Sequence, residues 1–524
     1  MKKKIILATI LIINLAVFLC ASLITTLNSN QTFYYFFMLY KMVNNSKVFF
    51  NNGIIYFFYS MFLILPYLGI IALFKKDNNK IENSDKIIHF NFKFLSLLIL
   101  IVSIICIFIL PNNSGDVFYY IATGRMSSVY KINPYETSLA EARKSYPDDP
   151  VINNGYNLKA TYAYGSAWFL ISKILACIPT NSNALLLYIF KIANTIVYLL
   201  SCYLIFKLSL IHQKEINQYL DDKKLIEKQN KIIDNKFKIN EIFDIFSLKQ
   251  INKSIITTLI YALNPLIIVS LLINCHNDTY VIFFILLAFY LKKRNKTLLA
   301  VLSLTLGTLI KYFPIMFLPY ILNKEKSKSK AILYFLMSIL IFVGVTFIST
   351  GSIKNLTAFL TQAVLYNSSI FVWILTFTNS NFDLVNVLAK IGKIIFVILY
   401  LSVLIYFYTM EKKKNVEIAE SKKMNIYNIL LFTFLLLATT CLRSWYFTWP
   451  FIFIPFWDLE KDQLKISAIE NISITIVMFS IIIALFGDGY YYTKYIYALS
   501  IIFSLILTCF DYIHHRKKIK EIIS

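Results

Sequence analysis

Acidic residues are scarce in this chain. Only 28 of its 524 residues are Asp or Glu, and all charged residues together make up 15%. In soluble domains roughly a quarter of the residues are charged, so the composition argues against an ordinary soluble fold. Apolar runs of about 18 residues or more, each long enough to cross a bilayer core of about 30 Å, recur along the whole length. The sequence therefore predicts an all-α polytopic membrane protein without a separate soluble domain.

Motifs of several other protein classes are missing from the sequence. The seven cysteines show neither the spacing of a metal site nor a disulfide framework. There is no internal repeat, no coiled-coil heptad pattern and no glycine-rich phosphate loop. We therefore expect no nucleotide-binding domain and no resident cofactor, and a divalent metal ion stays possible without being indicated.

The formal net charge of +24 does not predict a nucleic-acid partner. The lysines stand in short loops between apolar runs, as the positive-inside rule predicts for cytoplasmic loops. Counted from Lys2–Lys4, the lysine-rich loops fall on one side, which predicts cytoplasmic termini and about thirteen or fourteen membrane helices. The first apolar run has the basic flank of a signal sequence but is too long for one, and we interpret it as a retained span.

We expect three parts along the chain. Residues 1–93 are predicted to form a transmembrane hairpin with an inner loop, 94–465 a catalytic core, and 466–524 a second hairpin with a basic tail. Within the core, residues 111–183 form an outer loop bearing surface helices, one of them in WFLISKILACIP, and 212–253 a lysine-rich cytoplasmic insert.

Short and broken helices are expected inside the core. A span over residues 255–275 leads to the turn His276, Asn277, Asp278 and to a short span over 280–291. The segment TLLAVLSLTLGTLIKYFPIMFLPYIL predicts two short helices with Lys311 at an outer turn. Broken helices at membrane depth are tolerated mainly where they line a cavity.

Asp116 is the most informative single residue. It follows an apolar run, has no lysine close by in sequence and falls on the predicted outer face, where a carboxylate can act as a base. The same topology brings other ionisable residues to this face, where they are costly and often functional. A carboxylate such as Asp116 together with several cations indicates chemistry on an anionic lipid-linked group. The ionisable set is Asp116, Arg125, His276, Asp278, Lys311 and Arg443, and the surrounding aromatic set is Tyr119, Tyr120, Tyr135, Tyr162, Tyr312, Trp445 and Tyr446.

Each of these residues also has a purely structural interpretation. Asp116 could cap the helix that begins beside it. Arg125, Lys311 and Arg443 could reach lipid headgroups, and the aromatic residues could form an interfacial belt. The His276 turn could be an ordinary polar connection.

Four segments resemble a known family. The outer segment with Asp116 and then NPY resembles the first outer loop of the GT-C superfamily of integral-membrane glycosyltransferases. NPLIIVSLLINCHNDTY resembles the NP…HND turn of bacterial polyprenol-phosphate-mannose-dependent mannosyltransferases. LIKYFPIMFLPYIL and SWYFTWPFIFIPF resemble their lysine-then-proline segment and their late W-Y-x-x-W turn. The four occur in the same order as in that family, between Asn112 and Pro455.

The resemblance implies a GT-C-like bundle with a lipid-linked donor bound among the spans and Asp116 as the catalytic base. Lys311 and Arg443, with Arg125, are expected to bind the donor phosphate. Expected substrate-binding residues are His276, Asp278, Tyr120, Tyr135, Tyr162, Trp445 and Tyr446.

We therefore expect a hexosyltransferase in the cell membrane. It would move a mannose-like sugar from a polyprenyl phosphate to a glycan, glycolipid or protein of the cell envelope, with an extracytoplasmic site. A single base without a second carboxylate close by predicts inversion. Two alternatives stay open. A ligase or polymerase of polyprenyl-linked polysaccharides would usually have a larger late outer loop, and a lipid or solute transporter would more often show inverted repeats.

Overall fold

The fold is built of helices. The computed structural model describes residues 2–27, 63–75, 85–111, 114–155, 161–229, 239–323, 325, 327–351, 369–378, 381–413, 418–457, 463–486 and 502–509. Within these ranges every regular element is a helix, mostly α with short 3-10 and π segments. The all-α class predicted from the composition is confirmed.

Several helices are long and apolar enough to cross a membrane. The described residues contain four of them, or five if one bent pair counts as a span: Phe90–Phe108, Asn183–Glu215, Lys328–Thr350 and Phe382–Glu411. On the third helix Leu340 is 71% and Ile348 78% exposed, which suits contact with lipid. The polytopic class is confirmed. The number of about thirteen or fourteen spans stays a prediction, because several expected spans lie partly outside the described residues.

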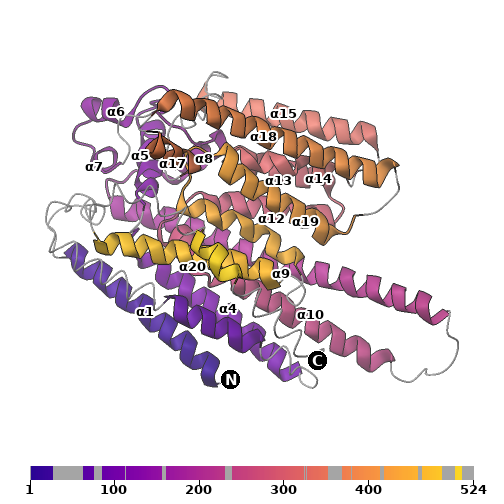
Figure 1. Ribbon diagram of the computed structural model, residues 1–524. Coiled ribbons are helices and arrows are strands. Elements are labelled where there is room, and N and C mark those ends of the chain that lie inside the picture. Colours follow the sequence, from indigo (N-terminus) through magenta and orange to yellow (C-terminus); the bar gives the residue numbers. More distant parts are fainter. Residues whose placement is uncertain are drawn as a thin grey trace.

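The N-terminal helices dock on the core through polar contacts. Helices α1 (Lys2–Leu27) and α4 (Asp85–Phe108) lie side by side (Figure 1). The buried Lys4 ammonium donates to Asn91 Oδ1 at 2.8 Å, and the Asn91 amide donates to Asn252 at 3.2 Å. The predicted division of the chain into three parts stays a prediction.

Short helices gather at one end of the long ones (Figure 1), here named the α5–α8 end. The Ser138 hydroxyl opens α6 with a capping box, and Asp149 caps α7 ahead of a proline. Gly124 allows α5 to pack closely on α8. A Cβ at this position would lie 2.4 Å from the Ser172 carbonyl oxygen, so a larger residue would not fit. The helix expected in WFLISKILACIP is confirmed as α8. The four are α5 (Asp116–Ser128), α6 (Leu139–Ser145), α7 (Pro150–Asn153) and α8 (Ser166–Leu175).

The span expected over residues 255–275 is broken rather than straight. Its halves, Gln250–Ala262 and Pro265–Ile273, meet at 48°. Pro265 causes the break because it has no N–H and its ring clashes with the preceding turn. Asn264 then caps the next turn by accepting from the N–H groups of Leu266 and Ile267. The elements are α10 (Ile239–Ala262), α11 (Pro265–Ile267) and the π-helix η2 (Ile268–Ile273), followed by α12 (Asp278–Lys293).

Helix α9 (Asn183–Gln229) crosses beside α10 and α12. It continues past the predicted end of its span, and α10 already begins at Ile239. The described residues of the predicted insert 212–253 are therefore largely helical.

The break predicted at Lys311 and Pro314 is confirmed. Helix α13 (Thr297–Thr308) is followed by the 3-10 helix η3 (Phe313–Phe317) and by α14 (Leu318–Leu322). Lys311 lies in the turn between α13 and η3.

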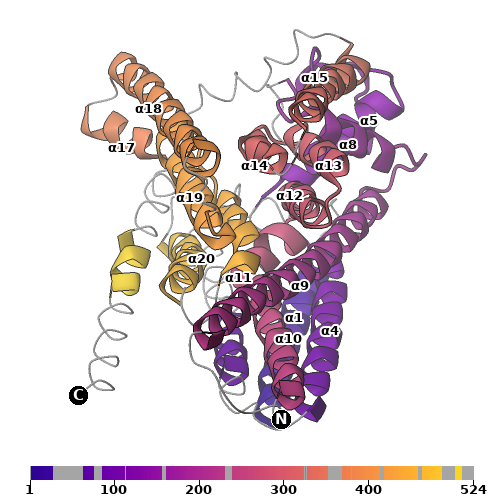
Figure 2. The same ribbon diagram turned by 90° about the vertical axis from the view of Figure 1, so that its right-hand side faces the viewer.

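One long 3-10 helix, η7 (Ser444–Phe456), packs on α9, α12, α19 and α20. Pro450 and Pro455 stand inside it and disfavour an α-helix, and its 13 residues reach about 26 Å at the larger rise of this helix type. Figure 2 shows α17, α18 and α19 on one side of the molecule and α8, α13 and α15 on the other. The remaining elements are α15 (Lys328–Thr350), α17 (Ile370–Phe377), α18 (Phe382–Tyr408), η5 (Thr409–Lys413), α19 (Glu420–Thr433), η6 (Phe434–Ala438) and α20 (Gln463–Phe486).

Candidate active site

Asp116 is the first residue of α5, and its carboxylate contacts two other parts of the chain. The Tyr164 hydroxyl donates to Asp116 Oδ2 at 3.0 Å, and His276 Nδ1 lies 3.5 Å from the same oxygen. The N-cap of α5 is Gly115, so the interpretation of Asp116 as the cap is not supported. The carboxylate is 17% exposed and remains open to a small reacting group.

Burial tunes this carboxylate toward a base. Burial raises the pKa of Asp116 above its ordinary value, while Arg443, the Tyr164 hydroxyl and Lys311 oppose the rise. A carboxylate with a raised pKa takes a proton more readily, and such shifts are frequent at catalytic positions.

The Tyr164 segment is tied to the turn that carries Lys311. The Gly165 N–H donates to the Ile310 carbonyl at 3.2 Å, and the Ala167 N–H donates to the Leu309 carbonyl at 3.0 Å. A Cβ on Gly165 would lie 2.0 Å from the Leu309 oxygen, so glycine is required for this approach. The start of α8 and the end of α13 therefore hold Tyr164 and Lys311 at one site.

His276 is presented by an unusual backbone. The preceding Cys275 has φ 56°, in the left-handed region that residues other than glycine rarely adopt. The His276 ring is buried and stacks on Trp445 with ring centroids 3.8 Å apart. Burial lowers the pKa of His276 to about 3, helped by Lys311 and Arg443 and opposed by Asp278. The imidazole is therefore neutral near pH 7 and can donate from one nitrogen while accepting at the other.

Asp278 forms an ion pair with Lys311 at the site. Lys311 Nζ lies 2.7 Å from both carboxylate oxygens, and Trp449 Nε1 donates to Oδ1 at 2.5 Å. The Lys311 ammonium also lies 4.6 Å from the ring centre of Tyr446. Burial lowers the pKa of Lys311, and Asp278 opposes this shift most strongly. Sequence reasoning placed Lys311 and Asp278 in separate roles, whereas the structure pairs them.

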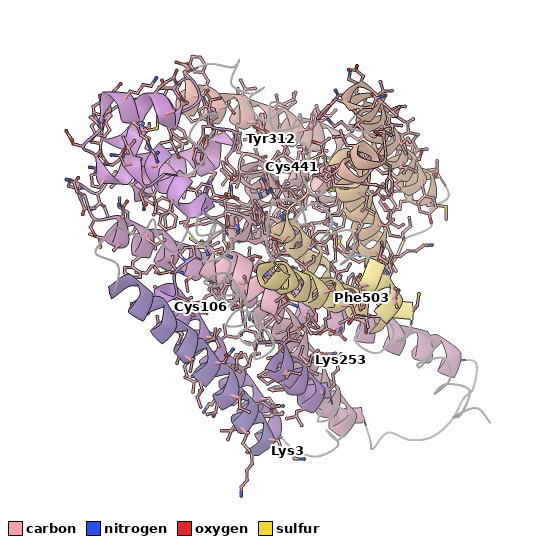
Figure 3. The ribbon with its side chains drawn as sticks, turned by 60° about the vertical axis from the view of Figure 1, so that its left-hand side comes forward. Lys3, Cys106, Lys253, Tyr312, Cys441 and Phe503 are labelled. Carbon is pink, nitrogen blue, oxygen red and sulfur yellow. The ribbon has the colours of Figure 1, made fainter. Side chains whose placement is uncertain are left out.

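The late aromatic turn lies against His276 and Lys311. Arg443 is the N-cap of η7, and its guanidinium lies 5.9 Å from the ring of Trp445. The Tyr446 ring stacks on Trp449 at 4.5 Å. Figure 3 labels Tyr312, which follows Lys311, and Cys441, which lies two residues before Arg443.

The other predicted tyrosines pack around Tyr164. Tyr120, Tyr135 and Tyr162 are buried among neighbouring aromatic rings. The Tyr135 hydroxyl donates to the Tyr164 carbonyl at 2.9 Å, and the Tyr120 ring meets that of Tyr164 edge-on at 5.1 Å. They therefore hold Tyr164 in place. Tyr164 and Trp449 are not among the residues expected from the sequence. The chain has 36 tyrosines, and nothing in the sequence singles out Tyr164.

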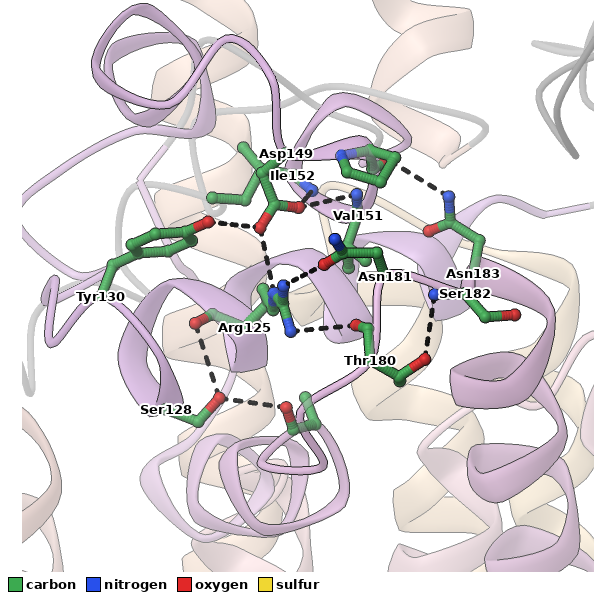
Figure 4. A network of polar contacts seen from close by, with 12 residues as sticks. Arg125, Ser128, Tyr130, Asp149, Val151, Ile152, Thr180, Asn181, Ser182 and Asn183 are labelled. Atoms are coloured by element: carbon green, nitrogen blue, oxygen red, sulfur yellow. Dashed lines mark hydrogen bonds and ion pairs between the residues drawn. The ribbon is translucent and has the colours of Figure 1, made fainter.

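Arg125 is not brought together with the other cations. It stands nine residues after Asp116, about 13 Å along the axis of α5. Its guanidinium donates to Asp149, to the Thr180 carbonyl and to Asn181 at 2.8 to 3.0 Å (Figure 4). These contacts connect α5 to the cap of α7 and to the segment before α9. In the structure Arg125 therefore stabilises the packing of the α5–α8 end.

Comparison with known proteins finds a similarity to one family. Residues 162–419, just under half of the chain, match the family model described as glycosyltransferase family 87. The matched region contains Tyr164, His276, Asp278 and Lys311, while Asp116 and Arg443 lie outside it. Neither the curated proteins nor the solved structures gave a match. The expected resemblance to membrane glycosyltransferases is confirmed over residues 162–419, which are similar to glycosyltransferase family 87.

Proposed function

We propose that this glycosyltransferase moves a mannose-like hexose from a polyprenyl phosphate to a hydroxyl group of a cell-envelope glycan, glycolipid or protein. The observation that carries the proposal is the site around Asp116. A carboxylate with a raised pKa lies beside Tyr164 and His276, and two cations stand on the neighbouring turns. This arrangement suits removal of a proton from an alcohol while an anionic leaving group departs.

Asp116 is the base of the proposed reaction. The acceptor oxygen attacks the anomeric carbon as its proton passes to the Asp116 carboxylate, and the bond from that carbon to the phosphate oxygen breaks. Proton transfer of this kind contributes about 10²- to 10⁴-fold to the rate. The nearby carboxylate of Asp278 is held by Lys311 and Trp449, which leaves Asp116 as the base and favours inversion by direct displacement.

Cations stabilise the leaving group. The phosphodiester becomes a phosphomonoester, so negative charge grows on it as the bond breaks. Arg443 and Lys311 lie beside the rings of Trp445 and Tyr446, where their charge can meet the developing phosphate. His276 is proposed to hold the acceptor hydroxyl or the phosphate through Nε2. These groups supply the chemistry without a resident cofactor.

The proposal puts the site on the extracytoplasmic side. Its support is the distribution of lysines, which favours cytoplasmic termini and the α5–α8 end outside. A donor flipped to the outer leaflet would present its sugar there, with its lipid chain among the exposed apolar helices.

The test is Asp116→Asn in purified protein given polyprenyl-phosphate mannose and a panel of envelope acceptors. Transfer should fall about 10²- to 10⁴-fold with the fold intact. Asp148→Asn is the matched control, because Asp148 is an exposed acid of the same end and should leave transfer unchanged. Near-wild-type transfer by the Asp116 variant excludes Asp116 as the base, and no transfer by the wild type from any polyprenyl-phosphate sugar contradicts the proposed donor class.

A further inference from the structure

The break at Pro265 and the end of η2 at Ile273 both leave backbone carbonyls without helical partners. Carbonyl groups at membrane depth need donors, because lipid supplies none. Within the described residues, α9 supplies them. The Tyr198 hydroxyl donates to the Ala262 carbonyl at 2.6 Å, and the Asn194 amide donates to the Leu271 carbonyl at 2.5 Å.

Lys191 completes this row of donors. Positions 191, 194 and 198 are spaced by three and four residues, so they share one face of α9. All three side chains are buried, and Lys191 is 0% exposed. Its ammonium donates to the Ile273 carbonyl at 2.9 Å and also to the Ile109 carbonyl. It is the member of the row that bonds two segments at once.

Those two segments carry the catalytic pair. Ile109 lies just after the end of α4, on the chain that leads to Asp116. Ile273 is the last residue of η2 and stands three residues before His276. Helix C-termini carry partial negative charge, so an ammonium group is well suited to hold two of them together.

We infer that Lys191 is a positioning residue for the proposed transfer. It fixes the end of α4 against the end of η2 and thereby sets the 3.5 Å approach of His276 to Asp116. The predicted effect on kcat rests on the proposed function. The predicted effect on the approach of His276 to Asp116 does not, because it is measured without substrate.

The test compares two members of the row. Lys191→Met removes the ammonium with little change of volume, and Tyr198→Phe removes a hydroxyl that donates to the Ala262 carbonyl and not to the segments that Lys191 joins. Both should lower the melting temperature in detergent. Only Lys191→Met should lower kcat, by about 10- to 100-fold, and shift the acid limb of the pH profile, because a small misplacement of reacting groups is that costly. If Lys191→Met does not fold, Lys191→Gln, which keeps a neutral donor, enters the same assays.

The second measurement uses no sugar. Asp116→Cys and His276→Cys are combined and joined with a short bifunctional thiol reagent, and the peptide product is identified by mass spectrometry. The yield should fall when Lys191→Met is added and persist when Tyr198→Phe is added. Equal kcat and equal crosslinking in the two backgrounds overturn the inference. If the wild type transfers no sugar but the crosslink depends on Lys191, the positioning role stands and the proposed function fails.

Discussion

The imidazole of His276 lies on the indole of Trp445, with ring centroids 3.8 Å apart and planes inclined by 24°. The two residues come from distant parts of the chain, the turn after η2 and the start of η7. The indole covers one face of the imidazole and keeps water from it. This stacking therefore links the shape of the late aromatic turn to the protonation of a group that touches Asp116.

Trp445→Ala should make transfer more sensitive to acid. The pKa of His276 is held at about 3 mainly by burial, so opening one ring face to water should raise it toward its ordinary value. An imidazolium beside Asp116 stabilises the carboxylate and weakens it as a base. Activity should be retained above the new pKa and lost as the pH falls through it. The measurement is kcat/KM against pH.

Trp445→Phe is the control for this prediction, because a phenyl ring preserves most of the cover. Its acid limb should stay close to that of the wild type. An acid limb in Trp445→Ala that coincides with the wild-type limb would show that the indole does not set the protonation of His276.

Hydropathy and charge predicted much of the framework. The apolar runs gave the helical class, and the lysine followed by proline at 311 and 314 gave the break between α13 and η3. The short resembling segments brought Asp116, His276, Lys311 and Trp445 into one expected site. These features are local, since each depends on a few neighbouring residues.

Lateral packing could not be predicted in the same way. The pairing of Lys311 with Asp278 depends on how α12 meets the α13–η3 turn, and the contact of Tyr164 with Asp116 depends on how α8 meets α5. Pro265 is a local signal for the break after α10. The sequence prediction nevertheless gave one straight span there, because the apolar run has the length of a span. Arg125 has the charge of a phosphate ligand, and only the fold reveals that Asp149 and Asn181 surround it.

Lys311 and Asp278 should behave as one unit in folding. Lys311→Ala leaves the buried Asp278 carboxylate without its cation and should cost about 3–5 kcal/mol of unfolding free energy. Lys311→Met combined with Asp278→Leu removes both charges and should recover most of that loss. Thermal unfolding of the purified variants in one detergent measures both effects, and additive losses in the double variant would contradict coupling.

The same pair separates stability from donor binding. If Lys311 meets the donor phosphate, the double variant should fold well and still show a raised KM for the polyprenyl-phosphate donor with little change for the acceptor. Unchanged donor KM in this folded variant would limit Lys311 to a structural role.

Cys275 should matter through its backbone rather than its thiol. Its φ of 56° costs most residues of order 1–3 kcal/mol, and a β-branched side chain fits this region worst. Cys275→Gly should keep or slightly raise the melting temperature and keep the aim of His276. Cys275→Val should lower both stability and kcat. Cys202→Val is the matched control, because Cys202 is also buried but lies in the regular helix α9, where valine is tolerated. Equal behaviour of the two valine variants in melting and transfer assays would show that the left-handed residue does not orient His276.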